Sequence, residues 1–197
     1  FKGFVCIGPN NANLNGLLVY HPTYNNNCQF QINSCSFWQF NANLYLETNA
    51  WRVSFNNCVF LDGYSQNVTL GNGTNEGESI KFDHCLIGDG GDFTISGSGI
   101  SLNCFSTSIL NTTLIITGNS NIFNLYGGNL ENPGSGLQYT YINIDNGTTT
   151  NRVTLFGTPI TVNTATWTVP LFYVAANNSL SFVNVTWPDI SNYDTIA

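Results

Sequence analysis

Acidic side chains that recur at one spacing are the residues of this sequence best suited to chemistry. Asp62 and Asp89 each follow a cysteine by four residues, and each precedes a glycine. Two carboxyl groups about 5 Å apart are the pair that a retaining glycosidase uses, one as nucleophile and one, with a raised pKa, as acid. Together with Glu131, Asp62 and Asp89 are the candidate catalytic residues. An Asp-Gly pair is also common in turns for backbone reasons alone, and that interpretation stays open.

Aromatic and amide side chains near these acids indicate a second kind of chemistry, the binding of sugars. Trp38, Gln39, Tyr64 and Asn132 lie at or near the equivalent positions of the chain. An aromatic ring packs against the apolar face of a sugar ring, while amides hydrogen-bond to its hydroxyl groups. These four residues are therefore the predicted glycan-binding residues. The alternative is that a neighbouring subunit covers some of the exposed aromatic rings.

One sequence repeat defines the elements that must position these residues. Residues 30–37, 53–60 and 80–87 align without gaps around a cysteine, which we number zero. Apolar residues stand five and three residues before that cysteine, at it, and two residues after it. Weaker copies follow, and the zero positions are 35, 58, 85, 105, 128, 158 and 185, which are 20 to 30 residues apart.

The spacing within each copy predicts two strands joined by a tight corner. Apolar residues two apart lie on one face of a strand, but the step from −3 to zero is three residues. Both apolar pairs can point inward only if the chain bends there. The bends fall at Asn33-Ser34, Asn56-Asn57, Asp83-His84, Asn103-Cys104 and Tyr126-Gly127, mostly residue types that tolerate turn conformations. Each copy is thus a β-solenoid coil, because a β-sandwich would not repeat one corner at one phase seven times.

The copies predict an all-β, single-stranded parallel β-helix of about eight coils. Residues 1–29 are expected to form an irregular N-terminal coil or cap, and residues 30–158 the regular coils. Residues 159–197 are expected to form the last coils and a C-terminal cap or transition. At about 4.8 Å per coil, the rod would be about 40 Å long.

The cysteines are interpreted as core residues. Cys35, Cys58 and Cys85 share one repeat position, so they would stack about 4.8 Å apart, beyond the Cβ separation of about 3.8 Å that a disulfide prefers. Cys6 and Cys28 lie about one coil apart, and whether they form a disulfide stays open. No metal and no cofactor are expected, because the sequence has no close cysteine pair and its two histidines lie far apart.

The coil size and the pattern resemble the right-handed parallel β-helix of the pectin-lyase-like superfamily. The segment Phe123–Asn132 contains an apolar strand, Gly127-Gly128 and Glu131. It is similar to a motif that recurs in phage tailspikes and capsule depolymerases, where it belongs to a coil near the glycan-binding face. The resemblance implies the right-handed fold and a homotrimer.

Two enzyme types of that superfamily are disfavoured. Pectate lyases use a basic side chain beside a calcium cluster of carboxylates, whereas Arg52 and Lys81, the only mid-chain bases, do not share the repeat position of the acids. Polygalacturonases resemble one another through an Asp-Asp pair and a Gly-His-Gly run, and neither occurs here.

Composition narrows the classes of partner. Four lysines and arginines stand against eleven acids, a net charge of −7, so no nucleic-acid partner is expected. No run approaches the roughly 18 apolar residues of a membrane span, so no membrane insertion is expected. A chain that contains no methionine and begins with Phe1 is expected to be a processed or excised piece, located outside a cell.

The sequence therefore predicts a virion tailspike-type receptor-binding module that recognises a host cell-surface polysaccharide or glycoprotein glycan. We expect it on the virion surface, in the tail, as a homotrimer. One alternative is a polysaccharide-degrading glycosidase of the same fold, a depolymerase of capsule or O-antigen. Another is a structural extracellular adhesin or filament subunit.

Overall fold

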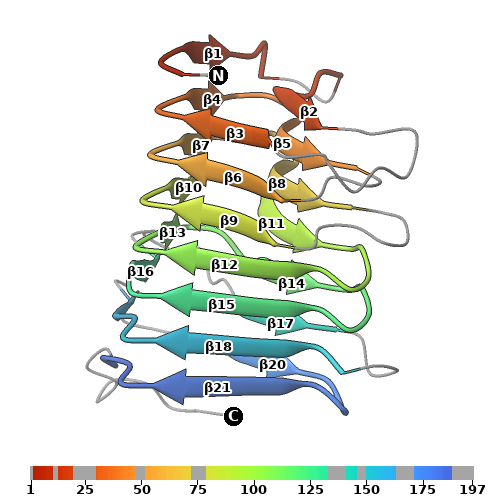
Figure 1. Cartoon of the computed structure of the whole chain (residues 1–197), viewed down its shortest axis with the longest axis vertical. Helices are drawn as coiled ribbons and strands as arrows, with labels where there is room; N and C mark the ends of the chain where they lie inside the picture. The colour runs from red at the N-terminus through yellow and green to blue at the C-terminus, as the bar shows by residue number, and fades with distance from the viewer. Residues whose placement is uncertain are drawn as a thin grey trace.

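The chain forms a parallel β-helix built from three sheets. The structure is a computed structural model that describes residues 2–10, 13–19, 30–47, 52–71, 79–132, 141–145, 150–162 and 171–187. These residues form 21 short strands, which stack into three parallel sheets of seven strands around a vertical axis in Figure 1. Within the described ranges, no helix is long and apolar enough to cross a membrane. The predicted parallel β-helix is confirmed, with seven strands per sheet where about eight coils were expected.

Each coil contributes one strand to each sheet. Sheet 1 contains β1 (Val5–Ile7), β4 (Ser36–Trp38), β7 (Val59–Leu61), β10 (Leu86–Gly88), β13 (Ser108–Leu110), β16 (Asn129–Asn132) and β19 (Ile160–Val162). Sheet 2 contains β2 (Leu17–Val19), β5 (Ala42–Leu46), β8 (Gln66–Leu70), β11 (Asp92–Ile95), β14 (Leu114–Ile116), β17 (Ile142–Ile144) and β20 (Phe172–Val174). Sheet 3 contains β3 (Phe30–Asn33), β6 (Val53–Asn56), β9 (Ile80–Asp83), β12 (Ser101–Phe105), β15 (Ile122–Tyr126), β18 (Arg152–Phe156) and β21 (Ser179–Val183).

The predicted corner separates sheet 3 from sheet 1 in every coil. The residue just before position zero has a left-handed backbone, which turns the chain sharply and is tolerated by glycine, asparagine and other small polar residues. These corner residues are Gly3 (φ 71°), Ser34 (54°), Asn57 (51°), His84 (52°), Ser106 (46°), Gly127 (64°), Gly157 (57°) and Asn184 (52°). The phase slip in the apolar pattern is therefore a left-handed turn, as the spacing indicated.

One copy of the repeat was aligned two residues too early. Leu102 pairs with Ile80, and Cys104 pairs with Phe82, so Thr107 and not Phe105 takes the position of Cys85. The bend consequently falls after Phe105 and not at Asn103-Cys104. Ile100, Leu102 and Cys104 are all buried, which makes the apolar alternation of this coil one step longer than in the others. The longer alternation allowed the template to fit in two registers.

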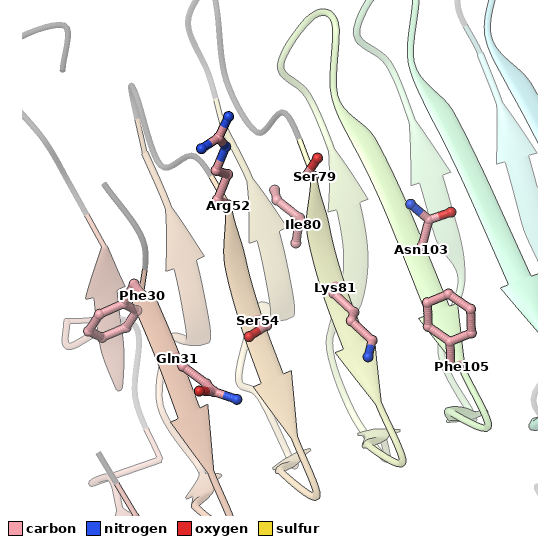
Figure 2. Close-up of a pocket in the computed structure, with 9 residues that line it drawn as sticks. All are labelled: Phe30, Gln31, Arg52, Ser54, Ser79, Ile80, Lys81, Asn103 and Phe105. Carbon is pink, nitrogen blue, oxygen red and sulfur yellow. The ribbon is translucent and has the colours of Figure 1, made fainter. Parts of the chain in front are cut away.

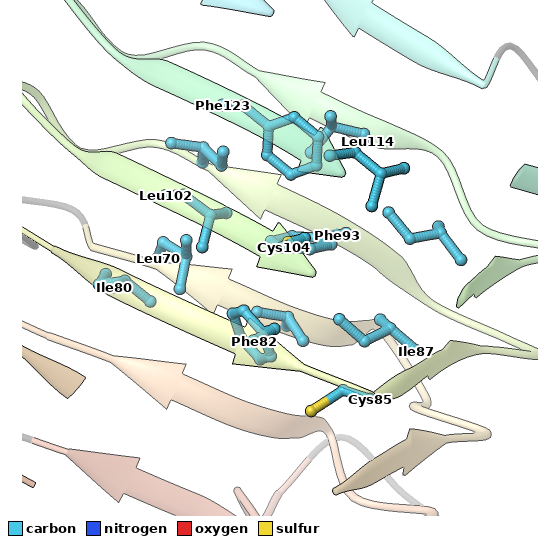
Figure 3. Close-up of a cluster of buried hydrophobic side chains, with 14 of the residues drawn as sticks. Leu70, Ile80, Phe82, Cys85, Ile87, Phe93, Leu102, Cys104, Leu114 and Phe123 are labelled. Atoms are coloured by element: carbon cyan, nitrogen blue, oxygen red, sulfur yellow. The ribbon is translucent and has the colours of Figure 1, made fainter. Parts of the chain in front are cut away.

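Side chains alternate between the core and the solvent along each strand. In sheet 3, Gln31, Ser54 and Lys81 lie on the outer face (Figure 2). On the inner side, phenylalanines stack from coil to coil: the ring centroids of Phe37 and Phe60 are 5.6 Å apart, and those of Phe55 and Phe82 are 4.9 Å apart. Figure 3 shows the continuation of this core through Phe82 and Phe123. Stacked rings add directional contacts to the burial of apolar area.

The cysteines at position zero are buried free thiols, as predicted. Cys35, Cys58 and Cys85 are at most 3% exposed, and each S–H donates to the carbonyl oxygen two residues earlier, at distances of 3.2, 3.4 and 3.5 Å. The hydroxyl groups of Thr107 and Thr158 make the same bond at 3.2 and 3.4 Å. In these five coils a small side chain with a donor at position zero bonds to the corner backbone, whereas Gly128 and Val185 occupy the same position without a side-chain donor. Cys6 is a free thiol, and its possible partner Cys28 lies outside the described residues.

Buried asparagine ladders explain part of the unusual amide content. Asn43 Nδ2 donates to Asn67 Oδ1 on the next coil at 3.0 Å, and Asn67 Nδ2 donates to the Gly91 carbonyl at 2.7 Å. A second ladder joins Asn121 to Asn151, whose Oδ1 accepts from the Asn121 backbone N–H at 2.9 Å. Such amides satisfy buried backbone groups at corners where no strand continues.

Candidate functional site

The predicted acids Asp62 and Asp89 lie on consecutive coils, directly after β7 and β10. The Asp62 N–H donates to the Gly88 carbonyl at 3.1 Å, and the Asp89 N–H donates to the Leu110 carbonyl at 3.0 Å. These bonds place Asp62 one coil from Asp89 at the edge between sheets 1 and 2. Asp89 Oδ1 also accepts from Asn111 Nδ2 at 2.8 Å, whereas Asp62 is exposed.

The backbone supplies a structural reason for aspartate at this edge. Gln39, Asp62, Asp89 and Asn111 all have left-handed φ values, 61°, 53°, 49° and 46°. Aspartate and asparagine adopt this conformation more readily than most residues. The turn interpretation of Asp-Gly therefore accounts for the alignment of the two acids. The Asp62 carboxyl group is exposed, whereas that of Asp89 accepts a hydrogen bond from Asn111.

The other predicted residues share this edge but spread along it. Trp38 and Glu131 lie on the outer side of sheet 1, in β4 and β16, which are four strands apart, or about 19 Å at the usual strand spacing. Glu131 Oε2 accepts from Asn129 Nδ2 at 3.0 Å, and Tyr64 is exposed on the turn after Asp62. The side chain of Asn132 lies outside the described part. The structure thus brings Asp62 and Asp89 together and leaves Glu131 two strands beyond β10.

An acid that the sequence did not single out lies on the same turn as Asp89. Asp92 begins β11, and burial raises the pKa of its carboxyl group. Its backbone N–H donates to the Ser65 carbonyl, on the turn after Asp62, at 3.4 Å. A carboxyl group whose pKa is raised by burial is the kind that acts as a general acid.

A groove lies on the outer face of sheet 3. It crosses β3, β6, β9 and β12 and encloses about 610 Å³ (Figure 2). Its floor and walls mix hydroxyl, amide, basic and aromatic side chains. The lining residues are Phe30, Gln31, Arg52, Ser54, Ser79, Ile80, Lys81, Asn103 and Phe105. Polar groups converging in a hollow with apolar walls are typical of a small-molecule or sugar site.

Lys81 is fixed within this groove by its neighbours. Its Nζ lies 2.8 Å from Asp83 Oδ2 and 5.1 Å from the centroid of the Phe105 ring. Asp83 Oδ1 also lies 2.7 Å from His84 Nδ1. The hydrogen bond from Lys81, with a smaller contribution from His84, lowers the pKa of Asp83 despite its partial burial. The positive charge of Lys81 is therefore partly balanced by Asp83.

A ladder of aromatic rings leads away from the groove along the outer face of sheet 3. The rings of Phe105 and Tyr126 are stacked with centroids 4.9 Å apart, and those of Tyr126 and Phe156 with centroids 4.7 Å apart. The interplanar angles are 9° and 6°, so each ring covers the face of the next. The ladder therefore presents ring edges to the solvent as an apolar strip, next to a column of outward amides that includes Asn103 and Asn124, bonded at 3.0 Å.

The groove was not predicted because one residue was placed on the wrong side of the sheet. Phe105 was assigned to the inward zero position, whereas it pairs with Asp83 and Tyr126 and points outward. The sequence did contain a signal for the groove, because Arg52 and Lys81 lie six and four residues before position zero, both even numbers. Even positions on the first strand of a coil that precede the bend lie on the outer face. Within the described ranges, no group of three or more metal-ligating side chains comes together.

Two known proteins are similar to this chain along most of its length. No protein-family model matches the chain. A protein named "Depolymerase, capsule K2-specific", from Klebsiella phage vB_KpnP_KpV74, is 32% identical over 207 residues, covering 98% of this chain and 35% of that protein. An "Uncharacterized 65.4 kDa protein in cps region" of Klebsiella pneumoniae is 28% identical over 180 residues, covering 86% of this chain and 29% of that protein. The chain thus spans about a third of the length of these curated relatives, and the predicted resemblance to tailspike-type phage proteins is confirmed.

Proposed function

We propose that this chain is a glycan-recognising β-helix of a phage tailspike-type protein and that it binds the capsular polysaccharide of a host bacterium. The observation that carries the proposal is the similarity to a capsule depolymerase along nearly the whole chain. The groove across β3, β6, β9 and β12 supports it, because its hydroxyl, amide and aromatic side chains suit a sugar polymer.

The proposal extends to location and assembly. A protein of this kind acts on the virion surface, in the tail, and outside the host cell. We propose a homotrimer, since only 8% of the residues are charged and the outer face of sheet 3 carries a partly exposed strip of stacked aromatic rings. Such surfaces favour association between subunits. Light scattering measures the mass in solution, and a monomer at micromolar concentration would contradict this part.

Binding to purified capsular polysaccharides tests the recognition function. The protein is immobilised and exposed to polysaccharides from Klebsiella strains of several capsule types, K2 among them, with dextran as a neutral control. We expect saturable binding to at least one capsule type and none to dextran. Equal binding to all polymers, or binding to none, would refute the proposed recognition.

A second candidate function is cleavage of the same polysaccharide. It is favoured by the raised pKa of Asp92, which lies on the turn that follows Asp89 and one coil from Asp62. In this proposal Asp92 or Glu131 is the acid, and Asp62 or Asp89 is the second carboxylate. Release of reducing ends from the polysaccharide measures cleavage.

Single amide substitutions separate cleavage from binding. Asp62→Asn, Asp89→Asn, Asp92→Asn and Glu131→Gln each remove one carboxylate. Asp145→Asn is the matched control, because Asp145 is exposed after β17, at the end of sheet 2 that faces away from the edge with sheet 1. We expect at least one of the four to abolish reducing-end release while polysaccharide binding persists. Full release by all four variants would exclude this edge as the catalytic site.

A further inference from the structure

The groove concentrates positive charge in a chain that has little of it. Only four of the 197 residues are lysine or arginine, and two of these, Arg52 and Lys81, line the same groove. Ser54 pairs with Lys81 across adjacent strands, and Arg52 precedes Ser54 by two residues. The Cα atoms of Arg52 and Lys81 are therefore roughly 8 Å apart, from about 3.3 Å per residue and about 4.8 Å between strands. The Lys81 ammonium group is directed toward Asp83, whereas the Arg52 side chain points toward the start of β6 (Figure 2), so the two cations serve different ends of the groove.

The two cations differ in how their charge is balanced. Lys81 is paired with Asp83 at 2.8 Å. Arg52 is exposed, and no acidic side chain in the described part of the chain pairs with it. The guanidinium group of Arg52 is thus the charge in the groove that is available to a ligand.

The backbone at Arg52 does not favour an arginine. Its φ is 50°, in the left-handed region, where the other described non-glycine residues are asparagine, aspartate, serine, glutamine and histidine. Arg152 occupies the same repeat position four coils later, at the start of β18, without a left-handed backbone. An unfavourable conformation kept by a long charged residue is a reason to look for a role of its side chain.

We propose that this groove binds a negatively charged sugar residue, with the Arg52 guanidinium donating to its acidic group; the inference rests on the proposed recognition of capsular polysaccharide. A guanidinium group presents paired N–H donors that match a carboxylate or phosphate. The side chains of Ser54, Ser79 and Asn103 hydrogen-bond to the hydroxyl groups of the same and neighbouring sugars. Phe105 forms an apolar wall.

The charge distribution directs an acidic polymer to this groove and away from the other candidate edge. Asp62 and Asp89 carry unpaired negative charge on the edge between sheets 1 and 2, and the chain as a whole has a net charge of −7. Like charges raise the energy of an acidic ligand there, whereas the groove offers a local positive field. The groove spans three strand intervals, about 14 Å along the axis, which fits a short run of sugar residues.

Chemical reduction of the ligand tests the inference directly. The probe is the Klebsiella capsular polysaccharide that the protein binds, used intact, after carbodiimide-activated reduction of its carboxylic acids to alcohols, and after mild acid removal of pyruvate ketals. We expect reduction to weaken binding to the wild type at least tenfold. If mild acid treatment alone removes binding, the acidic group is the carboxylate of a pyruvate ketal. If binding is lost only after full reduction, the acidic group belongs to a uronic acid.

Substitutions assign the effect to Arg52. Arg52→Gln is expected to bind the intact polymer at least tenfold more weakly and to be insensitive to reduction, while the matched Arg152→Gln behaves as wild type. Arg52→Gly relieves the left-handed backbone, so it is expected to keep or raise the unfolding temperature and still lose binding. Equal binding of intact and reduced polymer, or wild-type binding by both Arg52 variants, would overturn the inference and leave glycan recognition standing. Failure of the wild type to bind any capsular polysaccharide would instead overturn the proposed function.

Discussion

The glycine pair Gly127-Gly128 offers a sharp test of the corner geometry. Both glycines have left-handed backbones, with φ of 64° and 73°. A Cβ on Gly127 would meet nothing closer than Ser106 Oγ at 4.0 Å, whereas a Cβ on Gly128 would lie 2.0 Å from the Thr107 carbonyl oxygen. Alanine at the two adjacent positions therefore separates backbone strain from a steric clash.

The expected costs follow from these contacts. Gly127→Ala adds only the left-handed strain of an L-residue, about 1 kcal/mol. Gly128→Ala adds a similar strain and forces apart two coils at a backbone atom, so it costs about 2–4 kcal/mol when overpacking is included. For a chain of this size each kcal/mol lowers the unfolding temperature by about 2–4 °C. We expect losses of about 2–4 °C for Gly127→Ala and about 4–16 °C for Gly128→Ala.

Thermal unfolding followed by far-UV circular dichroism measures both variants. Gly157→Ala serves as a second control, since Gly157 has a φ of 57° and open space around its Cβ position, at the same corner one coil later. The unfolding temperature of Gly157→Ala should fall by as much as that of Gly127→Ala. Equal losses for Gly127→Ala and Gly128→Ala would refute the close approach of the coils, and the pair would then need a functional explanation.

Three further changes test other parts of the structure. The free energy of unfolding in urea of Cys85→Thr should lie within about 0.5 kcal/mol of the wild-type value, while that of Cys85→Ala should be about 0.5–1.5 kcal/mol lower. Only threonine keeps the donor to the corner carbonyl. Asp83 has a lowered pKa, so its ion pair stabilises the fold fully above about pH 4. The advantage of wild type over Asp83→Asn in thermal scans should shrink only as the pH falls below about 4, toward the lowered pKa of Asp83. Tyr126→Ser removes two ring stacks and should cost roughly 1–3 kcal/mol in urea unfolding; an unchanged midpoint would exclude a role of the ladder in stability.

The corner could be predicted from sequence because two constraints coincide there. The apolar pattern slips by one residue between −3 and zero, and the residue at −1 is small, polar or glycine in the same copies. Ser34, Asn57 and Gly127 all have the left-handed backbone that such residues allow. Where pattern and turn chemistry agree, they fix the phase of the corner closely. The repeat predicted two strands per coil, whereas each coil has three, because the strands of sheet 2 lie in the segments of variable length between the copies.

The side chains on the outer faces of the sheets could not be predicted as well as the corner. Their placement depends on knowing the register of each coil to within one residue. An error of two residues in the coil of Phe105 still keeps Ile100 and Leu102 inside, so the apolar pattern does not reveal it. It nevertheless moves Phe105 from the outer face, where it contacts Lys81, to the core. The acidic edge was found because Asp62 and Asp89 stand in well-aligned copies.

The position of the groove follows from the sizes of side chains in successive coils. On the outer face of sheet 3, Ser54 and Ser79 are small and Phe105 at one end is large, while Phe30 at the other end occupies an inward position and packs against the core. A parallel β-helix has a nearly constant backbone profile from coil to coil, so a hollow on its face must come from side-chain size alone. Small hydroxyl residues form the floor, and the longer side chains around them are the walls and the two cations. The same residues that create the space therefore supply its chemistry, which explains how a binding site can arise on the face of a flat sheet.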